Sequence, residues 1–264
     1  MVEYLDLAQD RPHSARMYDY YLGGKDNYPA DVAAAQQVLR AWPSAQLAAK
    51  SNRCFMQRVT RNLAEAGIEQ FLDIGTGIPT EPNLHQIAQR VRPNAHVVYV
   101  DNDPIVLAHA RALLVGAAEG RTTYLHADAT KPSSILSAPE LRKTVDLSRP
   151  VALSIIALLH FIEEGAHELV ATLVDALAPG SYLAICQVTG DYDQSVIDQV
   201  RAIYRGSGIT AQDRGFAEFA RFFDGLALQE PGIVPPHRWR VDGITPPESY
   251  DARVSSYAAV ARKV

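Results

Sequence analysis

The chain has 264 residues, 47% of them hydrophobic and 21% charged, with a formal net charge of −5 and a pI near 5.9. This composition is typical of a globular protein, and the absence of a global positive charge argues against nucleic acid or an anionic membrane as partner. We expect neither a signal peptide nor a membrane span, because the start is acidic and no 18-residue apolar run occurs. Two isolated cysteines, Cys54 and Cys186, favour reduced thiols and a cytoplasmic location.

Residues 1–66 are predicted to form an N-terminal helical segment without strands. Apolar spacing indicates helices over about 30–40 and 45–66, and Gly67 suits a helix C-terminus. The stretch 14–28 is rich in tyrosine, charge and glycine, so it makes a poor core helix and suits a lid or pocket wall. An arm that packs on the rest of the protein for stability alone is the alternative.

Residues 67–264 are predicted to form one α/β domain, because short apolar runs alternate with amphipathic segments. The expected strands are 70–74, 96–100, 122–127, 150–157 and 181–188, and the expected helices 79–92, 104–117, 132–138, 163–177, 192–205 and 212–223. Such alternation is typical of a parallel sheet with helices on both faces. Two further β-like pieces, 226–229 and 254–262, flank a proline-rich stretch, and strands joined without a helix pair antiparallel.

The first strand runs into a glycine turn in the sequence Asp73-Ile74-Gly75-Thr76-Gly77. The two glycines permit a sharp turn and a close approach of ligand to backbone. Thr80 replaces the third glycine of a dinucleotide fingerprint, and Glu81 in the expected first helical turn disfavours a pyrophosphate. Asp73 instead suits a ligand with an ammonium group. A generic strand–turn–helix connection is the alternative.

The second strand ends on Asp101, 24 residues after Gly77. A carboxylate at this position can accept hydrogen bonds from both ribose hydroxyls of a nucleoside. Asn102 and Asp103 follow, and we expect Asp103 to cap the next helix and Asp101 to bind ribose.

Polar residues also follow the third and fourth strands. Asp128 and Ala129 could bind an adenine edge through a carboxylate and a backbone amide, and a loop aspartate that caps a turn is the alternative. Ligands of open α/β sheets bind outside the carboxyl ends of the strands, so His160 is expected near the reacting atom. It would act as a general base or pack under the ligand. No metal is expected, because the histidines form neither HExxH nor a cysteine-rich array.

These motifs together resemble the class I S-adenosylmethionine-dependent methyltransferases. Nearly the whole chain is similar to an actinobacterial S-adenosyl methyltransferase family that was once classed as a domain of unknown function. The similarity is carried by residues 15–28, 52–53, 70–80, 97–104, 149–151 and 159–161, and it is weakest in the last quarter of the chain.

The resemblance implies a Rossmann-like, seven-stranded sheet with an antiparallel last strand, and an N-terminal lid over the pocket. It implies S-adenosylmethionine as cofactor and S-adenosylhomocysteine as product. The residues expected at the cofactor are Asp73, Gly75, Thr76, Gly77, Asp101, Asn102, Asp128, Ala129 and Ala157, and those expected in the lid are Arg16, Tyr18, Tyr21, Gly23, Lys25 and Asn27. His160 is the candidate catalytic residue.

The acceptor does not follow from the resemblance, so we expect in-line methyl transfer to an unidentified small molecule. The oligomeric state does not follow either. Three other functions are weighed against methyl transfer: cyclisation or cleavage of S-adenosylmethionine, sensing of this cofactor, and an NAD-dependent dehydrogenase.

Overall fold

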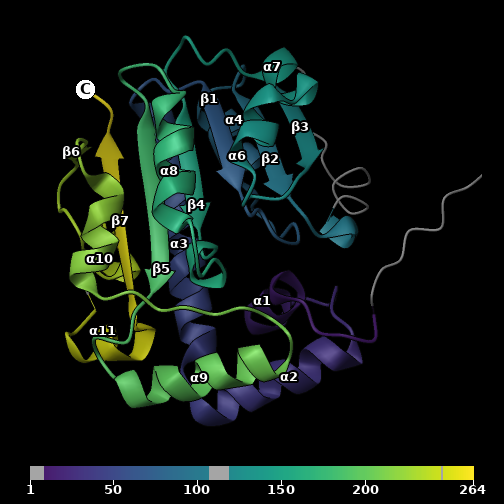
Figure 1. Ribbon diagram of the computed structural model, residues 1–264. Coiled ribbons are helices and arrows are strands. Elements are labelled where there is room, and N and C mark those ends of the chain that lie inside the picture. Colours follow the sequence, from purple (N-terminus) through teal and green to yellow (C-terminus); the bar gives the residue numbers. More distant parts are fainter. Residues whose placement is uncertain (1–8, 107–118, 245) are drawn as a thin grey trace, which may run out of the picture.

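A seven-stranded sheet forms the centre of the computed structural model, which describes residues 9–106, 119–244 and 246–264 (Figure 1). The strands are β1 (Gln70–Ile74), β2 (His96–Asp101), β3 (Arg121–His126), β4 (Ala152–Ile156), β5 (Tyr182–Val188), β6 (Ala227–Leu228) and β7 (Ser256–Arg262). Their order is β3-β2-β1-β4-β5-β7-β6. The first five strands are parallel, and β7 pairs antiparallel with both β5 and β6. The predicted fold class is therefore confirmed.

The strand order reverses at β1, which lies between β2 and β4. Asp73 pairs in register with Tyr99 on one side and Ser154 on the other. The connections that follow β1 and β4 run to opposite faces of the sheet. A crevice therefore forms between them at the carboxyl ends of the strands.

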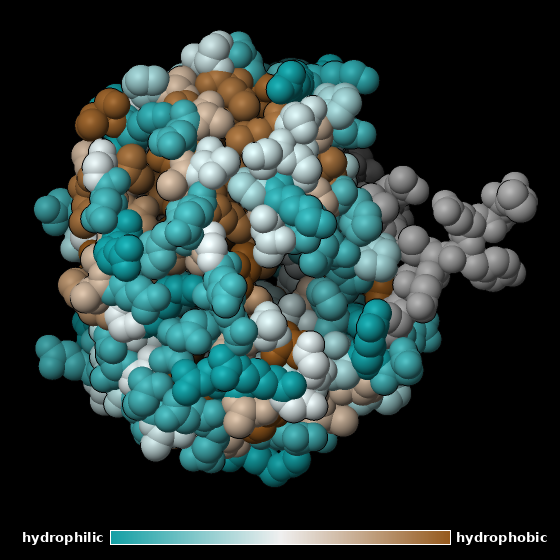
Figure 2. Space-filling model, in the orientation of Figure 1, coloured by the Kyte–Doolittle hydropathy of each residue, from teal (hydrophilic) through white to brown (hydrophobic). Residues whose placement is uncertain are grey.

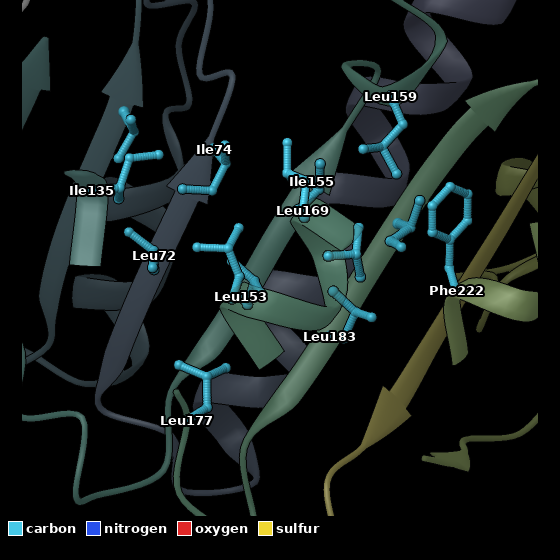
Figure 3. Packing of buried hydrophobic residues seen from close by; sticks show 14 of the residues in the cluster. Leu72, Ile74, Ile135, Leu153, Ile155, Leu159, Leu169, Leu177, Leu183 and Phe222 are labelled. Carbon is cyan, nitrogen blue, oxygen red and sulfur yellow. The ribbon is translucent and has the colours of Figure 1, made fainter. Parts of the chain in front are cut away.

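Helices cover both faces of the sheet. One face carries α6 (Pro132–Ser137), α7 (Pro139–Thr144), α8 (Ala166–Asp175), α10 (Phe216–Ala220) and the 3-10 turn η2 (Arg221–Phe223). Figure 3 shows Leu153 and Leu183 of the sheet meeting Leu169 and Phe222 of these helices. All four side chains are buried, so this face holds a continuous apolar core.

The opposite face carries α3 (Ala45–Glu65), α4 (Leu84–Val91) and the 3-10 turn η3 (Pro236–Arg238). Phe55 and Val59 of α3 pack with Phe71 of β1 and Val97 of β2. The third N-terminal helix thus shares a core with the sheet.

A third apolar cluster lies beyond the carboxyl ends of the strands. It joins α1 (Ser14–Leu22) and α2 (Pro29–Ala41) to α9 (Gln194–Gly206), which run below the sheet in Figure 1. Met17 and Tyr21 of α1 are buried in it. The tyrosine-rich stretch therefore forms a packed helix where its composition indicated a poor core helix.

Several predicted boundaries are corrected. The helix expected at 79–92 begins at Leu84, because Asn83 and Gln86 form a capping box there. Thr80 and Glu81 therefore lie in the preceding loop, and the argument against a pyrophosphate from the helix dipole does not hold.

The remaining differences lie outside the parallel part of the sheet. The segment 212–223 is divided into α10 and η2, and α7 and α11 (Ser249–Val254) were not predicted. Most of the helix expected at 104–117 falls outside the described residues. Within the described ranges, no helix has both the length and the apolar character needed to cross a membrane.

Candidate functional site

A cavity of about 780 Å³ lies where the carboxyl ends of β1 to β5 face α1, α3 and α9. Pockets for small molecules usually have volumes of about 300–1,000 Å³. The cavity reaches from the glycine turn and the ends of β2 and β3 to the ends of β4 and β5. It therefore occupies the crevice that the strand order creates.

The glycine turn after β1 forms one wall of this cavity. Gly75 and Gly77 have φ angles of 74° and 68°, in the left-handed region that favours glycine. A Cβ on Gly75 would lie 2.8 Å from the side chain of Leu158, whereas a Cβ on Gly77 would meet no described atom within 4 Å. Gly75 therefore serves close packing, and Gly77 exposes its backbone to the cavity beside Thr76, which also lines it.

Asp101 ends β2 and lines the cavity. Its Oδ2 accepts a hydrogen bond from the Gly77 N–H at 2.7 Å, and its Oδ1 accepts one from the Asp103 N–H at 2.9 Å. Burial raises the pKa of Asp101, and these two N–H donors oppose that rise. Each carboxylate oxygen keeps a further lone pair, so Asp101 can still accept hydroxyl donors from a ligand.

Asp73 lies at the end of β1, and Arg53 of α3 lies at the same end of the cavity. Burial raises the pKa of Asp73 to about 7, and the Arg53 guanidinium opposes this rise. Arg53 Nη2 donates to the carbonyl oxygens of Thr80 and Pro82, while its buried Nε has no hydrogen-bond partner in the described part of the chain. An acid beside a cation fits a ligand that carries both an ammonium and a carboxylate group.

Asp128 and Ala129 line the cavity beyond the end of β3. Asp128 Oδ1 accepts hydrogen bonds from the backbone N–H and the hydroxyl of Thr130, at 2.9 and 2.7 Å. Asp128 thus caps its own turn, which is the alternative role that the sequence left open. Its other oxygen lies 3.8 Å from the ammonium group of Lys131.

Asn102 and Ala157 also line the cavity. His126 Nε2 lies 3.0 Å from the carbonyl oxygen of Asn102, which fixes the backbone after β2. Ala157 has a φ of 59°, which is rare for a residue with a side chain. This conformation turns the chain sharply after β4, toward the segment that carries His160.

His160 lies in the 3-10 turn η1 (Leu159–Phe161) and lines the cavity. Arg214 holds this turn by donating to the carbonyl oxygens of Leu159 and Ile162, both at 2.8 Å. Burial and the nearby Arg214 charge lower the pKa of His160 to about 3, so its imidazole is neutral near pH 7. It can exchange hydrogen bonds with a ligand, but it is a weak proton acceptor.

Three of the six predicted lid residues line the cavity: Arg16, Tyr18 and Tyr21. The Tyr18 hydroxyl donates to the carbonyl oxygen of Ala49 at 3.1 Å, and the Tyr21 hydroxyl lies 3.3 Å from the Tyr204 hydroxyl. Burial raises the pKa of both Tyr18 and Tyr21 above the ordinary value. Their hydroxyls therefore stay neutral.

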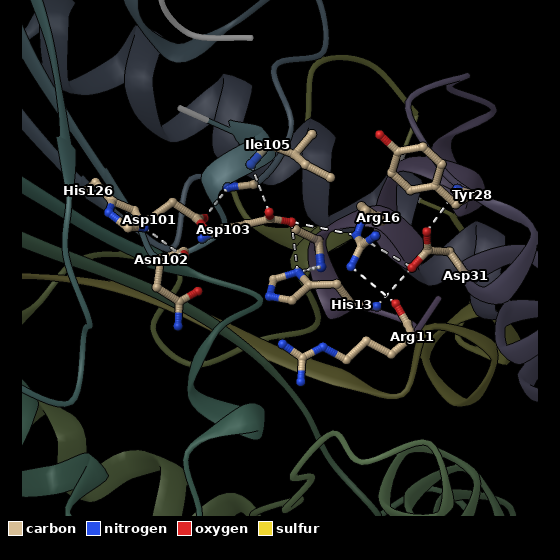
Figure 4. Close-up of polar contacts among 12 residues, drawn as sticks. Arg11, His13, Arg16, Tyr28, Asp31, Asp101, Asn102, Asp103, Ile105 and His126 are labelled. Carbon is tan, nitrogen blue, oxygen red and sulfur yellow. Dashed lines mark hydrogen bonds and ion pairs between the residues drawn. The ribbon is translucent and has the colours of Figure 1, made fainter. Parts of the chain in front are cut away.

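A polar network attaches α1 to the end of β2 (Figure 4). Asp103 Oδ2 lies 3.1 Å from His13 Nδ1 and 3.7 Å from Arg16 Nε, and Arg16 Nε lies 3.6 Å from Asp31 Oδ1. Asp103 Oδ1 also accepts the Ile105 N–H at 2.9 Å, which confirms its predicted role as a cap. The N-terminal segment is thus fixed beside the cavity by buried charges.

The structure does not bring the other three lid residues to the cavity. Gly23 ends α1 with a φ of 85°, and Lys25 is exposed. Asn27 Nδ2 donates to Asp19 Oδ2 at 2.8 Å and holds the connection between α1 and α2. This corrects the expectation that all six cover a ligand directly, because these three shape the lid from outside.

Several lining residues were not predicted as site residues. They include His13, Trp42, Asn52, Arg53, Met56 and Tyr204. The sequence pointed only to the pair Asn52-Arg53, which is part of the family resemblance. The others could not be found in this way, because the fold alone brings their segments together. Within the described ranges, no group of His, Cys, Asp and Glu side chains could hold a metal ion.

The family model for S-adenosyl methyltransferases matches residues 3–264. A DUF574 family protein from Streptomyces avermitilis MA-4680 is 48% identical in sequence, with 98% of this chain and 100% of that chain covered and a TM-score of 0.95. A candidate methyltransferase from Thermobifida fusca YX is 39% identical, with 97% of each chain covered and a TM-score of 0.90. No curated protein matches this sequence significantly.

Similarity of fold extends to more distant proteins. Human N-acetylserotonin methyltransferase in complex with S-adenosylmethionine is 12% identical, with 96% of this chain and 63% of that chain covered and a TM-score of 0.51. At this identity the likeness concerns the fold alone. The family match and the two similar structures show that the chain belongs to the S-adenosyl methyltransferase family and is an S-adenosylmethionine-dependent methyltransferase.

Proposed function

We propose that this enzyme transfers a methyl group to a small-molecule acceptor by in-line displacement. The observation that carries the proposal is the extent of the cavity. It begins at Asp73 and Asp101, at the ends of β1 and β2, and continues past the end of β4 to α9. Two ligands can therefore lie next to each other across the switch point of the sheet.

The residues at the β1–β3 side fit the parts of S-adenosylmethionine. The free lone pairs of Asp101 suit the ribose hydroxyls, and the open space before Gly77 admits the ligand close to the backbone. Asp73 and Arg53 both line the cavity, and their opposite charges suit the ammonium and carboxylate groups of the methionine part. Asp128 and the backbone of Ala129 are proposed to bind the adenine edge.

S-adenosylmethionine supplies a methyl group on a positively charged sulfur. The protein then has to align the acceptor with that group and exclude water, and alignment of this kind can lower a barrier by several kcal/mol. The lid residues Arg16, Tyr18 and Tyr21 close the cavity from the N-terminal side. The fixed network around Asp103 supports this role, because it holds α1 against the sheet.

His160 is proposed to orient the acceptor by a hydrogen bond from its neutral imidazole. Its lowered pKa, about 3, supports this role better than that of a general base. An acceptor with a hydroxyl or amine also has to lose a proton, and this role of His160 does not include that step.

We also propose that the acceptor is neither a nucleic acid nor a membrane lipid surface. The net charge of −5 supports this view, since it provides no overall attraction to polyanions. A cytoplasmic location is proposed as well, because Cys54 and Cys186 are both free thiols.

The substitution Asp101→Asn tests the proposal. It removes a charged acceptor of hydroxyl hydrogen bonds, so binding of S-adenosylhomocysteine should weaken by about 1–3 kcal/mol in calorimetric titration. Asp146→Asn is the matched control, because Asp146 is exposed and lies outside the cavity lining. Equal dissociation constants for the wild type and Asp101→Asn would refute the ribose assignment.

A further inference from the structure

The part of the cavity next to the ends of β4 and β5 has its own chemistry. We name it the acceptor compartment and define it by Tyr21, Trp42, Ala48, Phe161, Val200 and Tyr204. It lies between α1–α3 on one side and α9 on the other. The inference below rests on the proposed function, because it concerns the molecule that would receive the methyl group.

The walls of the acceptor compartment are apolar and aromatic. Ala45, Ala48 and Ala49 lie on one side of α3, as their spacing of three and four residues requires, and all are buried. Their small side chains leave room in front of Trp42, which is 8% exposed. Helix α9 turns Val200 inward, whereas its outer surface is mostly hydrophilic (Figure 2).

The charges at this end of the cavity are compensated. Among the described residues that line the compartment and its rim, the charged side chains beyond Arg53 are Arg201 and Asp213, which form an ion pair at 2.5 Å. Arg201 also pairs at 2.5 Å with Asp198, which is exposed and does not line the cavity, so the charges of the lining itself balance. The opposite end of the cavity differs, since Asp73 and Asp101 bring buried carboxyl groups to it.

The remaining polar groups of the compartment are neutral. The hydroxyls of Tyr21 and Tyr204 lie 3.3 Å apart, and burial raises the pKa of Tyr204 to about 12. His160 stands at the boundary with the cofactor side and is neutral as well. A charged ligand placed here would lose its hydration without gaining a counter-charge, which is strongly unfavourable.

We propose that the methyl acceptor is an uncharged aromatic molecule, whose ring lies among Trp42, Phe161 and Tyr204. Aromatic rings gain from edge-to-face or offset contacts with one another beyond the burial of their surface. Phe161 and Tyr204 already form a tilted ring contact, with centroids 5.5 Å apart and an interplanar angle of 56°. The paired hydroxyls of Tyr21 and Tyr204 are available to a neutral polar substituent on the ring.

Three probes of matched shape test this inference: 2-naphthol, 2-naphthoate and 2-naphthylmethylammonium. Each is titrated calorimetrically near pH 7, with and without saturating S-adenosylhomocysteine. The uncharged naphthol should bind at least about tenfold more tightly than either charged probe, which corresponds to 1.4 kcal/mol. Equal or tighter binding of a charged probe, or no binding of naphthol, would overturn the inference.

Substitutions that fill the acceptor compartment test whether naphthol binds there. Ala48→Phe should abolish naphthol binding and leave S-adenosylhomocysteine binding unchanged, and Val200→Phe fills the same space from α9. Gln46→Phe is the control, because Gln46 lies on the exposed side of α3. Naphthol binding that survives both filling variants would contradict the assigned place.

The titration with S-adenosylhomocysteine keeps the two claims separate. If the wild type fails to bind S-adenosylhomocysteine, the proposed function fails, whatever the naphthol probes show. If it binds S-adenosylhomocysteine but prefers a charged probe, the proposed function stands and the acceptor class is wrong.

Discussion

Asp73 shows how a single buried carboxyl group in the cavity can lower the stability of the folded protein. Its pKa is about 7, compared with an ordinary value of 3.8, and burial is the main cause. The folded state therefore holds this proton more tightly than the unfolded state, and stability decreases as pH rises from about 4 through about 7. A shift of this size corresponds to roughly 4 kcal/mol.

The variant Asp73→Asn tests this balance. The ligand-free variant should be more stable than the wild type near pH 8 by about 2–4 kcal/mol, because it buries no charge. Near pH 4 the difference should become small, since Asp73 is then protonated in the folded state and only about half ionised in the unfolded state. Urea denaturation at the two pH values measures this, and an equal difference at both would contradict the assigned pKa.

The two glycines of the turn offer a matched comparison. Alanine at either position has an unfavourable positive φ, so Gly77→Ala should lower the free energy of unfolding by about 1–2 kcal/mol. Gly75→Ala should cost about 1–3 kcal/mol more, because its methyl group would lie 2.8 Å from Leu158. Denaturant unfolding of both variants gives the comparison, and a larger loss for Gly77→Ala would refute the assigned roles.

At the scale of elements, the parallel strands could be predicted and the helix ends could not. Buried parallel strands have continuous apolar sequences, so β1 matches the predicted range 70–74. Pro79 fits the first turn of a helix, where no backbone N–H is needed, but the capping box at Asn83 fixes the actual start of α4. The spacing of apolar residues does not decide which of these two signals, the proline or the capping box, starts the helix.

The attachment of α1 to the end of β2 is testable through Asp103→Asn. The amide oxygen can still accept the Ile105 N–H, but the charge facing His13 and Arg16 is lost. Removal of one partner from a buried charge network is strongly destabilising, so amides of α1 should exchange with solvent at least about tenfold faster. Amides of β1 serve as the internal control, and unchanged protection of α1 would refute the network's role.

At the scale of the whole molecule, the end of the cavity that holds the strand-end acids could be predicted from the sequence, and the opposite end could not. Asp73 comes just before the glycine turn and Asp101 ends an apolar strand, and both patterns are visible in the sequence. The structure brings the two acids to one cavity. Trp42 directly follows α2 and Tyr204 lies in α9, more than a hundred residues later in the chain. Their place in one apolar cluster depends on the packing of α1, α2 and α9, for which no local pattern exists.

The packing of α3 connects the N-terminal segment to the sheet. Helix α3 contributes Arg53 and the three alanines Ala45, Ala48 and Ala49 to the cavity lining. Other residues of α3 pack in the core against β1 and β2. A change in the core under α3 should therefore also alter the cavity.

One measurement tests the central claim most directly: calorimetric titration of the wild-type protein with S-adenosylmethionine and S-adenosylhomocysteine, with NADH as the control. The account predicts dissociation constants in the micromolar range for the first two ligands and no binding of NADH. Binding of NADH by a folded sample that binds neither S-adenosyl compound would contradict it.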